Sequence, residues 1–276
     1  MKEAIKKIVP TSLWKMISKA YHVQFVIKNK NRVNRSKKAI AKYKDCHKGE
    51  RCFIIGNGPS LKAEDLTKLK KEYTFGMNTI FKIFPETPWR PTFYFVQDTK
   101  IIENFGKDIV SYGFDEVFVP LVKDYNYRNL FKNLSQAKCF IMPDAEKYPA
   151  ENKFIYDLSK GVIGNGLTIT YACMQMAVYM GFSEIYLIGM DHSFSVNMRP
   201  DGTIEYDKSV KSNHFGKDYA EGKMGTTFFL PKLQETELAY TTAKRFAEYH
   251  GLKIYNATRG GKLEVFERVN LDDIVK

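Results

Sequence analysis

Short apolar segments bounded by turn residues are the feature that most constrains how this chain folds. The expected strands are 52–55, 73–77, 92–96, 116–119, 139–142, 185–188 and 253–256. Between them the spacing of apolar residues predicts helices over 61–71, about 127–134, 167–180 and 231–250. This alternation predicts a Rossmann-like α/β fold, in which helices cover both faces of a mostly parallel sheet. The apolar runs are far shorter than the roughly 20 residues that a membrane-spanning helix needs.

The positive charge is concentrated near the N-terminus. Residues 1–50 hold 14 of the 43 Lys and Arg residues but only 3 of the 31 Asp and Glu residues. We therefore divide the chain into a basic, helical N-terminal extension (1–50) and one globular domain (51–276). Because that domain is nearly neutral and shows no nucleic-acid-binding signature, nucleic acid is not an expected partner.

Within the extension, apolar residues recur every four positions at Leu13, Ile17, Tyr21 and Phe25, with lysines between them. This pattern predicts an amphipathic helix that lies on an anionic membrane surface. The alternative is a helix packed on the main domain with its basic face in solvent. The basic run over 28–38 is expected to be a linker.

The four cysteines lie far apart and form no Cys-x-x-Cys pair, which predicts free thiols in a reducing compartment. The N-terminus lacks the continuous apolar run of a signal peptide. We therefore expect a cytoplasmic protein held at the inner face of the cell membrane. An oligomer is compatible with the sequence.

Ligands of parallel sheets bind outside the carboxyl ends of the strands. The first expected strand is followed by Gly56-Asn57-Gly58-Pro59-Ser60. Two glycines let a ligand approach the backbone, and the N-terminus of the next helix offers N–H groups to a phosphate. The segment lacks the lysine of a Walker A loop. Its alternative interpretation is a tight turn without a ligand.

Three further strand ends carry candidate side chains. Asn78 follows the second strand, and Gln97 and Asp98 follow the third. Amides can bind a base or a ribose without adding charge, although local turns also use these residues. Gly189 and Asp191 follow the central strand, and Asp191 is a candidate catalytic residue or a loop cap. No cluster with metal-ligand spacing accompanies it, so no dedicated metal site is expected.

Residues 192–230 form a long, polar, glycine-containing segment that is typical of a lid. His214 lies within it and is a candidate general base, because the pKa of histidine is near neutrality. The alternative is an inert surface histidine. Arg259 and Lys262 flank a Gly-Gly turn after the last strand and are candidates for binding an anion, or are simply solvated.

Taken together, segments 53–61, 75–78, 179–192 and 254–266 resemble the 6-hydroxymethylpterin diphosphokinase-like family, in order over about residues 50–270. The same skeleton is similar to bacterial lipooligosaccharide sialyltransferases and to the central domain of flagellin-modifying glycosyltransferases.

This resemblance implies a glycosyltransferase that uses a nucleotide-activated sugar, with a CMP-sialic-acid-like donor favoured. The reaction would invert the sugar carbon and require no metal or other cofactor. By motif position, Asn57 and Ser60 map onto the nucleotide loop, Asn78 onto a downstream asparagine that contacts the CMP-sugar, and His214 onto the base.

The acceptor implied is a glycan or a lipid-linked glycan of cell-surface polysaccharide or lipooligosaccharide synthesis. Two alternatives stay open. One is an ATP-dependent 6-hydroxymethylpterin diphosphokinase, which would need Mg²⁺ and has Asp98 and Asp191 as available ligands. The other is a protein without catalytic activity that binds a nucleotide or a glycan at a membrane surface.

Overall fold

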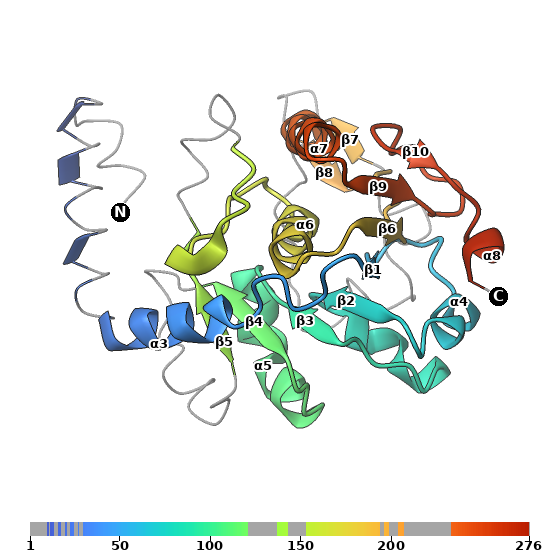
Figure 1. Ribbon diagram of the computed structural model, residues 1–276, viewed down its shortest axis with the longest axis horizontal. Helices are drawn as coiled ribbons and strands as arrows, with labels where there is room; N and C mark the ends of the chain where they lie inside the picture. The colour runs from blue at the N-terminus through green and yellow to red at the C-terminus, as the bar shows by residue number, and fades with distance from the viewer. Residues whose placement is uncertain are drawn as a thin grey trace.

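The computed structural model describes residues 30–120, 137–142, 153–193, 196–198, 204–206 and 233–275, together with Pro10 and a set of helical positions between 12 and 27. Figure 1 shows one layer of strands with helices above and below it. Within the described part of the chain, no helix combines the length and the apolarity that crossing a bilayer requires.

An eight-stranded parallel sheet forms the centre of the molecule, in the order β10-β9-β6-β1-β2-β3-β4-β5. Its strands are β1 (Arg51–Ile55), β2 (Tyr73–Met77), β3 (Phe93–Phe95), β4 (Val117–Pro120), β5 (Lys138–Phe140), β6 (Glu184–Ile188), β9 (Lys253–Asn256) and β10 (Glu267–Arg268). A separate antiparallel pair consists of β7 (Val196–Met198) and β8 (Ile204–Tyr206). The sheet confirms the predicted α/β class.

Helices cover both faces of this sheet, as the sequence predicts (Figure 1). The described helices are α3 (Lys30–Ala41), α4 (Ala63–Lys68), α5 (Thr99–Ser111), α6 (Ile169–Met180), α7 (Leu233–Tyr249) and α8 (Leu271–Ile274), with 3-10 turns η1 (Ile80–Glu86) and η3 (Leu158–Lys160). Residues of α6 and α7 belong to one apolar core, and residues of α4, η1, α5 and α8 belong to the core on the opposite face. The helix expected at 127–134 lies outside the described residues.

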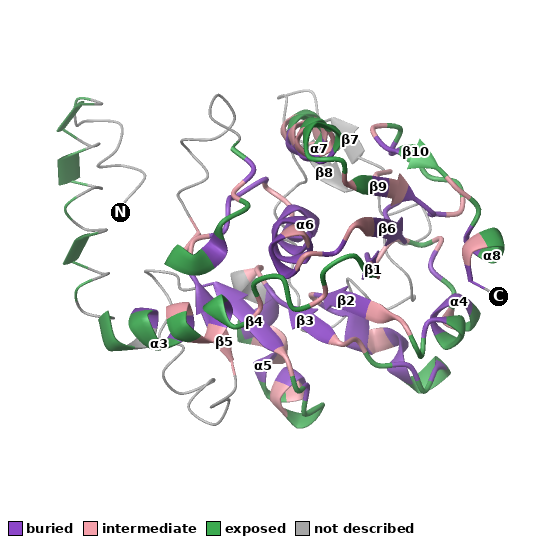
Figure 2. Cartoon of the chain, viewed as in Figure 1, coloured by how far each residue is buried: buried purple, intermediate pink, exposed green. Residues whose placement is uncertain are grey.

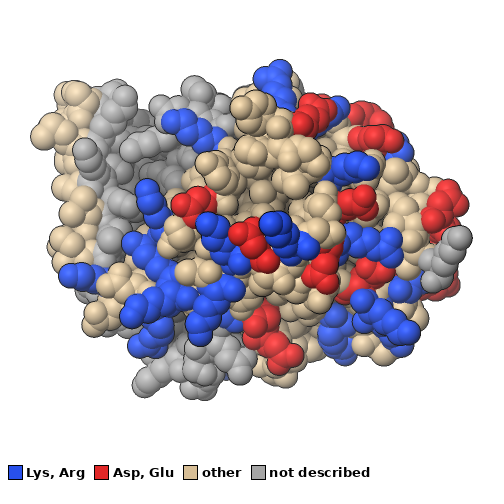
Figure 3. Space-filling view, viewed as in Figure 1, with Lys and Arg blue, Asp and Glu red and all other residues tan. Residues whose placement is uncertain are grey.

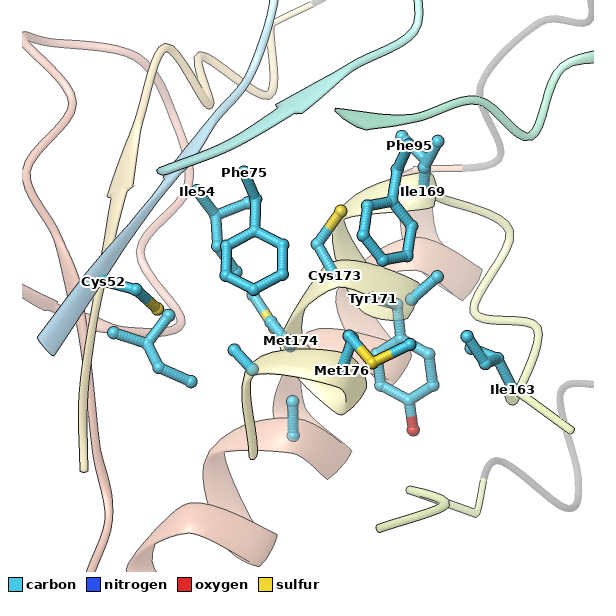
Figure 4. Close-up of a cluster of buried hydrophobic side chains, with 14 of the residues drawn as sticks. Cys52, Ile54, Phe75, Phe95, Ile163, Ile169, Tyr171, Cys173, Met174 and Met176 are labelled. Carbon is cyan, nitrogen blue, oxygen red and sulfur yellow. The ribbon is translucent and has the colours of Figure 1, made fainter. Parts of the chain in front are cut away.

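Successive residues of the central strands enter opposite cores, because side chains alternate across a sheet. On β1, Cys52 and Ile54 pack toward α6, whereas Phe53 and Ile55 pack toward the other face. Figure 4 shows Ile54 beside Phe75 of β2, and Cys173, Met174 and Met176 of α6 belong to the same cluster. A strand that is buried on both faces must be apolar throughout, which explains the continuous apolar runs.

Helix α6 is buried on almost all sides, as its colour in Figure 2 shows. It ends at Gly181, whose φ of 91° suits a left-handed cap. Gln175 is a polar residue inside this helix, and its side chain is fully buried. Its Oε1 accepts from the backbone N–H groups of Ile155 and Gly164, at 3.1 and 2.8 Å, and its Nε2 donates to the carbonyl of Gly164 at 3.0 Å. One side chain therefore fastens the segment before α6 to the helix.

The expectation of a linker over 28–38 is wrong, because residues from 30 onward form α3 and pack on the sheet edge at β5. Val33, Ser36 and Ile40 lie three or four positions apart and are buried. The Ser36 hydroxyl also accepts a hydrogen bond from the backbone N–H of Cys139 at 3.1 Å. Two apolar residues at this spacing are enough to dock a helix whose other positions are mostly basic.

Candidate functional site

The carboxyl ends of β1, β2, β3 and β6 lie at one edge of the sheet (Figure 1). From β1 the chain adds strands on one side as far as β5 and then returns to place β6 on the other side of β1. The reversal between β1 and β6 is the kind of position where open α/β sheets bind ligands. All predicted site residues except His214, which lies outside the described residues, can be placed relative to it.

The loop after β1 packs tightly against the turn after β6. The backbone N–H of Gly56 donates to Ile188 at 2.8 Å, and that of Gly58 donates to Gly189 at 2.9 Å. A Cβ atom on Gly56 would lie 2.4 Å from the Gly189 carbonyl oxygen. The glycines are therefore required by the approach of two protein segments, whatever binds beside them.

Asp191 belongs to the turn after β6 and contacts Ser60, at the far end of the loop that follows β1. Its Oδ2 accepts from the Ser60 hydroxyl at 2.7 Å and its Oδ1 from the Ser60 backbone N–H at 3.2 Å. On its other side, the Lys262 backbone N–H donates to the Asp191 carbonyl oxygen at 2.7 Å. Burial raises the pKa of Asp191, and the hydrogen bonds from Ser60 act in the opposite direction.

The position of Asp191 limits what the loop can bind. The Ser60 amide, one of the groups predicted to approach a phosphate, already donates to this carboxylate. A phosphate at the same amide would have to displace Asp191 or meet its negative charge. Asp191 therefore fixes the loop at Ser60, and the groups left for a ligand are others in the loop and along the edge.

Two amide oxygens along this edge are buried and have no hydrogen-bond partner among the described residues. Asn57 donates from Nδ2 to the Met77 carbonyl at 3.1 Å, so the atom left over must be its oxygen, and that Oδ1 is unpaired. Gln97 Oε1 is unpaired in the same way. Because an unpaired buried acceptor is unfavourable, both oxygens are suited to receive N–H or O–H donors from a ligand.

Asn78 lies between these two residues in the sheet and orders the backbone there. Its φ of 49° is left-handed, its N–H donates to Phe95 at 2.8 Å, and its Oδ1 accepts from the Gln97 N–H at 3.4 Å. Asp98 follows, half-buried, and its carbonyl accepts from Ile102 at the start of α5. The structure thus brings Asn57, Asn78 and Gln97 to neighbouring strand ends.

The two basic candidates after β9 have different environments. Arg259 is held by Asp65 at 2.8 Å and by Asp272 at 3.1 Å, and these carboxylates raise its pKa. Its guanidinium therefore links α4 to the C-terminal turn and is not aimed at a ligand. The Lys262 side chain is exposed beside the Asp191 backbone.

His192 is a candidate that sequence reasoning passed over in favour of His214. It directly follows Asp191, is half-buried, and has a left-handed φ of 49°. Burial lowers its pKa, so the neutral imidazole that can accept a proton is favoured at neutral pH. The sequence signal for His192 is its position in the turn that follows the central strand.

Within the described ranges, no three His, Cys, Asp or Glu side chains come together as metal ligands. Asp191 is bonded to Ser60, and Asp98 stands at the start of α5. Because Mg²⁺ is usually held by one or two carboxylates together with substrate phosphates, Asp98 and Asp191 remain the carboxylates that the sequence offers to the diphosphokinase alternative.

A sequence model described as 6-hydroxymethylpterin diphosphokinase MptE-like matches residues 25–197. The matched region begins before α3 and contains every predicted site residue up to Asp191, but not His214 or Lys262. Searches of curated proteins and of solved structures gave no significant match.

Proposed function

Since the chain belongs to the 6-hydroxymethylpterin diphosphokinase MptE-like family, we propose that it is a transferase whose donor is a nucleotide-activated compound bound at the carboxyl edge of β1, β2 and β3. The observation that carries this proposal is that the buried amide oxygens of Asn57 and Gln97 accept no hydrogen bond from any residue the structure describes. A nucleotide offers the neutral donors that such oxygens need, namely ribose hydroxyls and the amino group of a base.

Within this class we favour a glycosyltransferase with a CMP-sialic-acid-like donor, in the synthesis of surface polysaccharide or lipooligosaccharide. Support comes from the likeness of the Gly-Asn-Gly-Pro-Ser loop and Asn78 to the nucleotide-binding residues of bacterial sialyltransferases. Pyrophosphate transfer is the second candidate, because it gives no reason for the basic N-terminal segment, which suits an enzyme with a lipid-linked acceptor.

In the proposed reaction, an acceptor hydroxyl oxygen attacks the sugar carbon and forms the new glycosidic bond. The bond from that carbon to the phosphate oxygen breaks, the nucleotide leaves with the electron pair, and the carbon is inverted. His214 accepts the hydroxyl proton, and Lys262 stabilises charge on the leaving phosphate. Asp191 is a positioning residue that holds the loop through Ser60.

Ligand-induced stabilisation tests the nucleotide site directly. The thermal midpoint of the full chain is measured with CMP, UDP, GDP and ADP, and with their sugar conjugates. We expect the cytidine compounds to raise the midpoint most. Stabilisation by Mg-ATP and 6-hydroxymethylpterin instead, with formation of a diphosphate that a chelator abolishes, would replace the glycosyl transfer by the diphosphokinase reaction.

Turnover separates an enzyme from a binding protein. With the donor selected by the panel, sugar transfer to a glycan acceptor should persist when EDTA is present. His214→Ala should lower kcat by roughly 100-fold with little change in nucleotide affinity, whereas His192→Ala should change kcat by less than about tenfold. The reverse ranking would assign the base to His192, and tight nucleotide binding without any turnover would favour a protein that only binds.

A further inference from the structure

We infer that the N-terminal helical positions and the basic face of α3 together bind the surface of an anionic lipid bilayer, at the inner face of the cell membrane. The two parts are adjacent in the chain, and they offer the two kinds of contact that an interfacial segment makes. One is an exposed apolar helix face and the other is a dense group of cationic side chains.

The apolar part is a row of exposed side chains. Of the predicted apolar pattern, Leu13 and Ile17 are described, and Tyr21 and Phe25 lie outside the described residues. The large apolar residues described between 12 and 27 are exposed, namely Leu13, Met16, Ile17, Val23 and Ile27. Their spacing of three or four residues, with Ala20 between them, places them along one face of a helix. Met16 is 68% exposed and Ile27 is 66% exposed, although such side chains normally lie inside a protein.

The cationic part is the outer face of α3 and the turn after it. Residues 28–44 contain eight Lys and Arg residues and no Asp or Glu. Lys30, Arg35, Lys38, Lys42 and Lys44 are exposed. Figure 3 shows Lys and Arg side chains gathered over α3, beside the uncharged described residues at the left of the view.

The basic face has a fixed direction because the opposite face of α3 is docked. Val33 and Ile40 are buried, and Ser36 accepts the hydrogen bond from Cys139. The helix therefore cannot turn its cations toward the protein without breaking these contacts. The long Lys and Arg side chains that remain outside can reach lipid phosphates.

Charge decides between a bilayer and a second copy of this chain as the occupant. Pairing two copies through this face would bring together two segments that each carry 14 Lys and Arg against 3 Asp and Glu over residues 1–50. Like charges at that density repel, whereas an anionic lipid surface attracts the same residues. The exposed apolar row then enters the boundary between headgroups and acyl chains.

Co-sedimentation of the full chain with vesicles tests this inference. Binding is compared for phosphatidylcholine alone and for phosphatidylcholine with phosphatidylglycerol. We expect binding only with the anionic lipid, falling steeply between about 0.05 M and about 0.5 M salt. Arg35→Glu with Lys38→Glu should weaken binding by about 100-fold or more, and Met16→Glu with Ile27→Glu by at least about tenfold.

Matched variants on the main domain control for charge and for apolar surface. Lys70→Glu with Lys71→Glu makes the same charge change after α4, and Leu238→Glu with Tyr249→Glu replaces exposed apolar residues of α7. Both should bind vesicles as the unmodified chain does, and circular dichroism should show all four double variants folded.

The inference would be overturned by equal binding to neutral and anionic vesicles, or by unchanged binding of the α3 variant. Self-association that Met16→Glu with Ile27→Glu abolishes, in a chain that ignores vesicles, would assign the apolar row to a second copy. None of these results depends on the nucleotide panel, which tests the sheet edge alone.

Discussion

Replacing Gln97 with methionine tests the candidate site through two effects of opposite sign. Gln97 Oε1 is buried and has no hydrogen-bond partner in the described part of the chain, and the Gln97 backbone N–H, which donates to Asn78, is untouched by the change. An unpaired buried polar group is unfavourable by about 1–3 kcal/mol. Methionine has a similar length and carries no acceptor that requires a donor. The free energy of unfolding of the unliganded chain should therefore rise by about 1 kcal/mol, which corresponds to about 2–4 °C in the thermal midpoint at this size.

Ligand affinity should move the other way. A nucleotide that donates a hydrogen bond to Gln97 Oε1 loses that bond in Gln97→Met and leaves its own donor buried and unpaired. We expect the Kd to rise by about tenfold or more. Urea denaturation and isothermal titration calorimetry measure the two effects, and Gln234→Met on the exposed side of α7 should change neither. Destabilisation of the unliganded chain, or an unchanged Kd, would refute the assignment of this oxygen to a ligand.

Three further substitutions test the contacts around the edge. Gln175→Leu removes the partners of both backbone groups of Gly164, so the free energy of unfolding in urea should fall by about 3 kcal/mol or more. Gly58→Ala places a Cβ atom 1.8 Å from Asp191 Oδ2 and should lower the thermal midpoint, with a loss of about 2 kcal/mol or more. Burial raises the pKa of Asp191 above that of an unfolded aspartate, which is about 4. Between these two pKa values the folded chain binds more protons than the unfolded chain, so the stability of the folded chain falls as the pH rises. Asp191→Asn, which keeps an oxygen for Ser60, should therefore gain stability relative to the unmodified chain as pH rises through this window in urea titrations.

The controls for these substitutions use the same chemistry at exposed positions. Gln234→Leu should leave stability unchanged, and a loss like that of Gln175→Leu would show that the side-chain exchange itself is harmful. For the pH series, Asp115→Asn changes a carboxylate on the loop before β4. A stability difference between Asp191→Asn and the unmodified chain that stays constant from about pH 4 to about pH 7 would contradict the argument from burial. A Gly58→Ala chain as stable as the unmodified chain would contradict the argument from packing.

The sheet was predictable because its central strands are buried on both faces and are therefore apolar along almost their whole length. Tyr73–Met77 and Lys253–Asn256 have the predicted bounds, and the other predicted strands of the sheet lie within a few residues of them. Helix α3 was missed because only Val33 and Ile40 mark its buried side in a segment rich in lysine and arginine. The many charged residues suggested a linker, although the spacing of Val33, Ser36 and Ile40 is that of one face of a helix.

The sequence predicts where the candidate site lies, but not all of the hydrogen bonds within it. Strand ends identify Asn57, Asn78 and Gln97 without any coordinates, because parallel strands present their carboxyl ends at one edge. The bond from Asp191 to Ser60 could not be foreseen, since it joins residues 131 positions apart in the chain. That contact engages the Ser60 amide with the protein's own carboxylate, which the glycine pattern of the sequence does not reveal.

The docking of α3 also protects the outermost strand of the sheet. Edge strands expose backbone groups that can recruit strands of other molecules, and β5 is the terminal strand on its side. The Ser36 hydroxyl takes up the Cys139 amide there, and the helix body lies alongside. Deleting residues 1–41 to remove the basic segment would therefore expose the backbone of β5, and the shortened protein should aggregate under conditions in which the full chain stays in solution.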